Sequence, residues 1–217
     1  MLKFLCAQAV NGRLWIPLAM VACVAPMWAA DVHQLPEYVF TLAPQYEPDA
    51  WIRGGERFPA GAALYLAAGH ERHRIAPDVS FSADAFVSYD GSRLLFSGKR
   101  TLDEPWQVWE ALFSGGAARQ ITQGDTDCTR PLYLPDGRVV YTRRAGLESM
   151  LEVAQSDGGM VERLTFAPGL YLTDDVLKDG RIFIRGCEPA IHRRKTGTIH
   201  CLPGWVWRRV AAVRPRT

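Results

Sequence analysis

The sequence of 217 residues predicts an all-β fold built from a recurring antiparallel sheet. Two short landmarks recur in step along the middle of the chain, and short runs of β-branched and aromatic residues lie between them. No long helical period appears between Pro59 and Ile184. Hydrophobic residues make up 48% of the chain and charged residues 22%, a balance that excludes full-length disorder and favours a globular core.

The first landmark is an Asp-Gly pair, and its copies are 46 and 43 residues apart: Asp90-Gly91, Pro135-Asp136-Gly137 and Asp179-Gly180. The second landmark is an aliphatic residue after Arg or Gln, at Ile75, Ile121 and Leu164, and it keeps the intervals 46 and 43. Asp-Gly marks a tight turn, because glycine accepts the positive φ that such turns need. Two landmarks with the same two intervals indicate a true repeat.

Each repeat contains the parts of a small antiparallel sheet. A short apolar run follows each Asp-Gly turn, as in Leu94-Leu95-Phe96, Val139-Val140-Tyr141 and Ile182-Phe183-Ile184. Such runs are typical of strands buried on both faces. About four strands in roughly 40–50 residues is the signature of a β-propeller blade. The predicted fold is therefore a partial β-propeller of about three four-stranded antiparallel blades, preceded by an N-terminal signal or anchor helix.

The repeats resemble the TolB-type, WD40-like (PD40) propeller repeat, whose core reads S-P-D-G-x-x-hydrophobic-x-F. The best copy is Leu134 to Thr142, and Tyr89 and Lys178 replace the proline in the other two copies. The stretch from Phe81 to Phe166 is also similar to the propeller region of hydrazine synthase alpha subunit-like proteins. The resemblance covers roughly residues 60–186 and implies a scaffold for protein contacts, or for an active domain encoded separately.

The recurrent turn residues are structural candidates: Asp90, Gly91, Pro135, Asp136, Gly137, Asp179 and Gly180. We predict no catalytic residue, cofactor site or metal site, since no nucleophile elbow, Walker loop or Rossmann loop is present. His70 and His73 are three residues apart, whereas a zinc helix of the H-E-x-x-H kind needs two histidines four apart. We interpret that segment as a solvated loop, with metal binding as the alternative.

The N-terminus has the order of a secretory signal. Lys3 and Arg13 precede an uncharged apolar run from Leu14 to Ala30, and Asp31 ends it. Export to the periplasm or another extracytoplasmic compartment is the prediction for residues 1–30. Lipid attachment at Cys23, an uncleaved membrane anchor and a buried N-terminal helix are the alternatives.

The rest of the chain divides into three parts. Residues 31–59 are rich in proline and predict an extended lead-in, residues 60–186 form the propeller blades, and residues 187–217 form an aberrant basic tail. The repeat stops after Ile184, and the tail holds seven Lys or Arg against one acid. We hypothesise that the tail comes from a truncated or frame-shifted reading frame. The alternative is a basic segment for acidic lipid or nucleic acid.

The predicted function is that of an exported, non-catalytic propeller portion that acts as a protein-interaction scaffold. A closed propeller needs roughly four to eight blades, so about three leave open strand edges. We expect a protein partner or self-association through these edges, membrane contact only through the N-terminal segment, and no nucleic acid, because the net charge is only +2. The alternatives are the propeller part of a larger multi-domain enzyme, hydrazine synthase alpha-like or prolyl-peptidase-like with no catalytic residue in this chain, and a non-functional remnant.

Overall fold

The computed structural model describes residues 37–187 and the backbone of a strand at 206–210. These residues form four antiparallel sheets in chain order, and every strand pairs with its neighbour in the sequence. The all-β prediction and the four-stranded antiparallel sheets are confirmed. The sheets number four rather than three, two with four strands and two with three among the described residues. The predicted N-terminal helix lies outside this part of the chain.

The first sheet contains β1 (Tyr38–Leu42), β2 (Ala63–Ala68) and β3 (Glu71–Arg74). The second contains β4 (Phe81–Val87), β5 (Arg93–Lys99), β6 (Gln107–Leu112) and β7 (Arg119–Gln120). The third contains β8 (Cys128–Tyr133), β9 (Val139–Ala145), β10 (Glu148–Ala154) and β11 (Glu162–Arg163). The fourth contains β12 (Leu170–Val176), β13 (Ile182–Cys187) and β14 (Val206–Val210).

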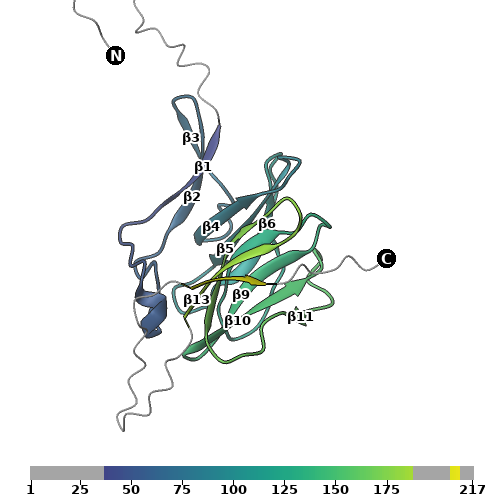
Figure 1. The fold of residues 1–217 in the computed structure, drawn as a ribbon. Coiled ribbons are helices and arrows are strands. Elements are labelled where there is room, and N and C mark those ends of the chain that lie inside the picture. The colour runs from purple at the N-terminus through teal and green to yellow at the C-terminus, as the bar shows by residue number, and fades with distance from the viewer. Residues whose placement is uncertain (1–36, 188–205, 211–217) are drawn as a thin grey trace, which may run out of the picture. The chain divides into compact units, whose positions relative to one another are not determined.

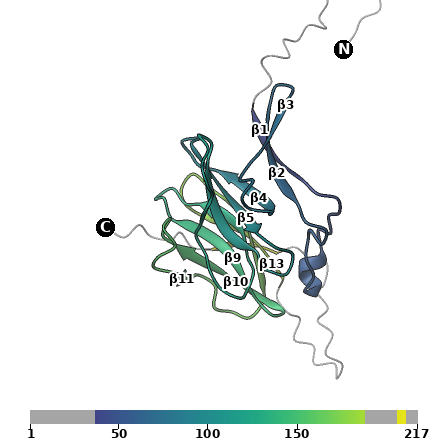
Figure 2. The same ribbon diagram turned by 180° about the vertical axis from the view of Figure 1, so that it is seen from behind.

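The sheets pack face to face (Figures 1 and 2). Clusters of buried side chains form the core between them. Between the first and second sheets, Leu64 packs with Leu94, Phe96 and Trp109. Two further clusters fill the next interfaces, and their members alternate along the middle strands. Consecutive residues point to opposite faces of a strand, so a short apolar run such as Leu94 to Phe96 serves two interfaces at once.

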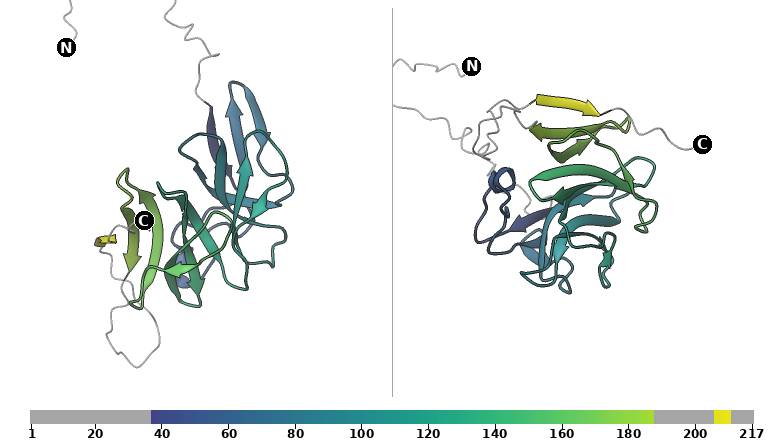
Figure 3. Two further views of the ribbon diagram at one scale, coloured as in Figure 1. Left: turned by 90° about the vertical axis from the view of Figure 1, so that its right-hand side faces the viewer. Right: turned by 90° about the horizontal axis from the view of Figure 1, so that it is seen from below.

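The first strands of the second, third and fourth sheets lie next to one another, since β8 contacts both β4 and β12. Figure 3 shows these sheets stacked in chain order, from the teal second sheet to the yellow-green fourth sheet. Each of these strands carries a register shift in its pairing with the second strand of its sheet. The shifts fall between Ala83 and Phe86, between Thr129 and Leu132, and between Thr173 and Asp175.

Two strands lie where the sequence analysis did not predict them. β1 forms inside the segment 31–59, which was expected to be an extended lead-in, and it pairs along its full length with β2. β14 forms in the backbone of the basic tail and pairs with β13. The chain origin proposed for the tail stays a prediction.

Candidate functional site

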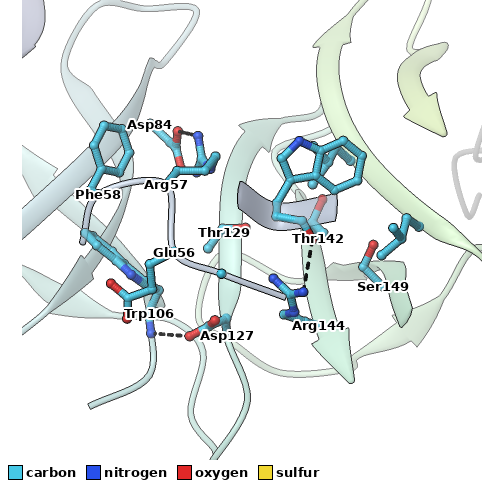
Figure 4. Close-up of a pocket in the computed structure, with 14 residues that line it drawn as sticks. Glu56, Arg57, Phe58, Asp84, Trp106, Asp127, Thr129, Thr142, Arg144 and Ser149 are labelled. Carbon is cyan, nitrogen blue, oxygen red and sulfur yellow. Dashed lines mark hydrogen bonds and ion pairs between the residues drawn. The ribbon is translucent and has the colours of Figure 1, made fainter. Parts of the chain in front are cut away.

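The segment from Ala43 to Ala62 joins β1 to β2 and reaches the sheets that follow in the sequence; we call it the connecting segment. It contains one turn of 3-10 helix, η3 (Ala50–Arg53), which ends at Gly54 in the left-handed conformation. Trp51 on this turn is buried against Leu170 and Leu172 of β12. The Arg144 guanidinium of β9 donates a hydrogen bond of 3.0 Å to the Trp51 carbonyl oxygen (Figure 4).

One basic side chain of the second sheet holds the other half of the connecting segment. Lys99 of β5 has a fully buried side chain, and its ammonium donates hydrogen bonds of 2.8 Å to Glu56 and of 2.8 Å to the Leu102 carbonyl. The same ammonium lies 5.1 Å from the centre of the Trp106 ring. A buried ammonium is costly unless it is paired, and these contacts provide its partners in the interior.

A small pocket lies between the connecting segment and the strands beneath it (Figure 4). Its volume is about 50 Å³, and Trp51, Trp106, Asp127, Thr129 and Thr142 contribute to its lining. One ordered water needs about 10–15 Å³ measured in this way, whereas pockets for drug-sized ligands span about 300–1,000 Å³. The pocket therefore has room for only a few water molecules, and its walls are apolar for the larger part.

A row of charged side chains follows the register shifts of the first strands. Asp84 of β4, Arg130 of β8 and Asp174 of β12 each lie at a shift. Arg130 lies 3.6 Å from Asp174, measured from Nη1 to Oδ1. Arg57 of the connecting segment pairs with Asp84 at one end. At the other end, Arg185 of β13 donates a hydrogen bond of 3.0 Å to Asp174. We call these five residues the charged row, in which positive and negative groups alternate.

Hydroxyl groups tie the charged row to the strands. Ser97 donates a hydrogen bond of 2.9 Å to Asp84 and accepts one of 3.0 Å from the Arg130 backbone N–H. Asp84 and Arg130 have φ values of 55° and 54°, in the left-handed region that non-glycine residues rarely adopt. Strain of this kind persists only where the surroundings fix the conformation. The ion pairs and the Ser97 hydroxyl provide that constraint.

The pKa values in the row follow from burial and from the opposite charges. Burial by itself raises the pKa of Asp84, but Arg57, Arg130 and the Ser97 hydroxyl outweigh it, so the pKa lies below its usual value. Burial lowers the pKa of Arg130 because it disfavours the charged form. Burial also lowers the pKa of Arg57, yet its ion pair with Asp84 leaves the net pKa raised. The ion pair between Arg57 and Asp84 therefore favours the charged forms of both side chains.

The buried polar side chains of the described residues bind other groups of the same fold. Every buried side-chain nitrogen or oxygen in this part of the chain has a hydrogen-bond partner. Among the same residues, no group of three or more His, Cys, Asp or Glu is placed to hold a metal ion. His73 lies on the exposed strand β3, with its Nε2 3.2 Å from Glu71. The site as built is therefore a structural network of ion pairs and hydrogen bonds.

The structure places all seven turn residues named from the sequence in the loops between first and second strands. Gly91, Gly137 and Gly180 have φ values of 69°, 84° and 79°. In each loop the Asp carboxylate accepts a hydrogen bond of 3.1 Å from the backbone N–H two residues later, at Ser92, Arg138 and Arg181. Hydrogen bonds from Ser88 and Ser92 lower the pKa of Asp90. The three loops thus repeat one geometry, with the Asp as the turn-forming side chain.

Sequence reasoning missed the charged row, although a signal for part of it was present. Asp84 and Arg130 each lie six residues before the Asp of an Asp-Gly pair, and Asp174 lies five residues before its own. Two copies carry Asp and the middle copy carries Arg, so no single residue type marks that position in all three copies. Arg57 lies in the connecting segment, outside the repeat, and only the fold brings it to Asp84.

Comparison with known proteins agrees with the repeat architecture. No protein-family model matches the chain. The Protein TolB homolog of Protochlamydia amoebophila (strain UWE25) is 29% identical over 111 residues, which cover 46% of this chain and 24% of that protein. The structure of Kuenenia stuttgartiensis hydrazine synthase matches with a TM-score of 0.60 and 14% identity, over 70% of this chain and 28% of that one. TolB from Acinetobacter baumannii matches with a TM-score of 0.42 and 16% identity, over 58% of this chain and 35% of that one.

The chain has a TolB-like β-propeller fold. The resemblance stated from the Asp-Gly repeats is thereby confirmed. The chain spans about a quarter of the length of the TolB homolog and of the hydrazine synthase chain. What those whole proteins do therefore bears on this chain only as a proposal. Within the described residues, no helix has the length and apolar character needed to cross a membrane.

Proposed function

We propose that this chain is an exported, non-catalytic β-propeller portion that acts as a protein-interaction scaffold in the periplasm or another extracytoplasmic compartment. The observation that carries the proposal is that the charged side chains of the candidate site form their ion pairs and hydrogen bonds within the fold. The charged row and the anchors Lys99 and Arg144 all bind parts of the fold itself. The pocket beneath the connecting segment has room for only a few waters. Similarity to TolB-type sequences supports a role in protein contacts.

The proposed compartment rests on the N-terminal sequence. Lys3 and Arg13 followed by the apolar run to Ala30 are typical of a secretory signal, and Asp31 follows. Membrane attachment, if present, is proposed to occur only through this segment. No nucleic-acid partner is proposed, because the net charge of +2 gives little attraction for phosphates.

An interaction experiment in the exporting cell tests the function. The full chain with a C-terminal tag is expressed at low level, cells are fractionated by osmotic shock, and the periplasmic fraction is cross-linked and purified. We expect the chain in that fraction, with a partner or a second copy at a fixed ratio by quantitative mass spectrometry. A chain that stays in the cytoplasm, or that is exported and remains alone, contradicts the proposal.

The second candidate is the propeller part of a larger multi-domain enzyme. The match to hydrazine synthase favours it, because the chain aligns with 28% of that longer chain at a TM-score of 0.60. Intact-mass measurement on the natural protein, captured with an antibody against the described sheets, distinguishes the two. A mass far above 24.2 kDa supports the multi-domain candidate.

A further inference from the structure

The first sheet is in phase with the second and third sheets but begins one strand later. The backbone N–H groups of Ile75, Ile121 and Leu164 donate hydrogen bonds of 2.9, 2.8 and 2.8 Å to the carbonyls of Leu64, Val108 and Leu151. These bonds make β2, β6 and β10 equivalent, so β1 is equivalent to β5 and β9. Among the described residues, the first sheet has no counterpart of β4 and β8.

This phase identifies the residues on the two faces of the first sheet. Phe40 pairs with Tyr65 across β1 and β2 as Phe96 pairs with Trp109 across β5 and β6. Tyr38 occupies the position of Leu94. In the second sheet, Leu94 and Phe96 are fully buried because the first sheet covers them. In the first sheet, Tyr38 is 57% exposed and Phe40 and Tyr65 are half-buried.

We call this surface the end face; it consists of Tyr38, Phe40, Leu42, Tyr65, Arg72 and Arg74. Its aromatic rings form one cluster, with ring centres 5.8 Å apart from Tyr38 to Phe40 and 5.8 Å apart from Phe40 to Tyr65. The Arg72 guanidinium lies 5.9 Å from the Phe40 ring. A shallow groove of about 430 Å³ continues the face past Leu42 and Arg74. Aromatic residues with arginine at the edge are the composition enriched at protein interfaces.

The positional match defines what kind of structure covers the end face. In the second and third sheets, the equivalent positions pack on the sheet that precedes them in the chain. They contact the residues of that preceding sheet that face forward, which are Leu64 in the first sheet and Val108 in the second. In the second strands, Leu95 and Val140 face forward and are fully buried. The fourth sheet has no following sheet among the described residues. Its forward side and the end face are therefore the two ends of the described stack of sheets.

We propose that the end face binds the fourth sheet (β12 to β14) of a second copy of this chain, packed face to face as successive sheets pack within one copy. The proposal rests on the interaction function proposed above and names its partner. The contact joins two different surfaces, and two such contacts related by a two-fold axis close a ring that contains the eight described sheets of the two copies. Eight is within the range of closed propellers, which have typically four to eight blades. Closure covers the open face that would otherwise favour aggregation.

Two matched leucines provide the mutational test. Leu42 ends β1 on the end face and is 53% exposed, and Leu112 ends β6 away from that face and is 52% exposed. Sedimentation equilibrium of the purified full chain measures the dimer dissociation constant. We expect a dimer that Leu42→Arg weakens at least tenfold and that Leu112→Arg leaves unchanged. Circular dichroism verifies that both variants are folded, as expected for substitutions at exposed positions.

Cross-linking identifies the occupant. A photo-reactive phenylalanine replaces Leu42, and isotopically light and heavy copies are mixed before irradiation. We expect light-to-heavy cross-links into residues 170–187. A monomer at all concentrations, a dimer that Leu42→Arg does not weaken, or cross-links only within one copy overturns the proposal. A monomer that still captures a fixed-ratio partner in the periplasmic experiment overturns the second copy alone and leaves the scaffold function in place.

Discussion

Gly98 of β5 lies in a tightly packed part of the core beside Val79, Phe96 and Trp109. A Cβ atom at this position would lie 2.7 Å from the Val79 side chain and 2.9 Å from the rings of Phe96 and Trp109. Real Cβ atoms do not approach other heavy atoms so closely, so the neighbours would have to move. All three neighbours are buried, and a close-packed core does not yield without cost.

We therefore predict that Gly98→Ala destabilises the protein by about 1–3 kcal/mol, the usual range for overpacking. At roughly 2–4 °C per kcal/mol for a chain of this size, thermal unfolding detects the change. Gly186→Ala is the control, because the nearest atom to its added Cβ would be 3.5 Å away. Equal melting temperatures for the two variants would contradict this account of the interface.

Asp84 couples the stability of the charged row to pH. Its pKa is lower in the folded chain than in an unfolded one, where Asp titrates near 3.9. The stabilisation is therefore fully present above about pH 4 and is lost as the pH falls through the folded pKa. We predict that Asp84→Asn has a flatter acid limb in a plot of melting temperature against pH, and lower stability at pH 7 because Arg57 and Arg130 lose their partner.

Asp103→Asn is the control for this experiment, since Asp103 is exposed in the loop between β5 and β6. It should keep the acid limb of the parent chain. If Asp84→Asn also keeps that limb, the charged row does not govern acid stability.

At the scale of the elements, the connecting segment links parts of the chain that are far apart in sequence. Trp51 is 6% exposed and lies against β12, about 120 residues further along the chain. We predict that Trp51→Ala costs about 3–5 kcal/mol, as for other large aromatic residues in cores. Trypsin should then cut rapidly at Arg53 and Arg57.

Tyr46→Ala serves as the comparison, because Tyr46 lies in the same segment and is 55% exposed. A small change in melting temperature and slow cleavage are expected there. If Trp51→Ala resists trypsin as well as the parent chain, the connecting segment is held by its ion pairs with Asp84 and Lys99.

The strands that follow Asp-Gly pairs were predictable from the sequence, because turn chemistry and a short apolar run are both local signals. The predicted runs at Leu94, Val139 and Ile182 lie in β5, β9 and β13. β1 was not predictable in this way, since no Asp-Gly turn precedes Tyr38. The charged row depends on register shifts and on Arg57, and neither has a local signature. The landmark at Ile75 already contained the phase of the first sheet, but only the backbone hydrogen bonds reveal the strand that it lacks.

For the whole molecule, dimer formation makes thermal stability depend on concentration. A ligand that binds only the folded state adds about 1.4 kcal/mol for each tenfold rise in its concentration above the dissociation constant, and here the ligand is the second copy. We predict that the melting temperature rises with protein concentration between about 1 and 100 μM. Leu42→Arg should give a flat line over the same range. A parent chain with a flat line would indicate that the monomer is the unit that unfolds.

The contact between Trp51 and β12 also sets an order of events during synthesis. Ribosomes add residues one at a time, so η3 emerges long before Leu170 and Leu172 exist. Contacts that are distant along the chain form late, since the intervening loop must first close. The indole of Trp51 therefore stays uncovered until the fourth sheet has been synthesised. A chaperone can bind the exposed indole during that interval.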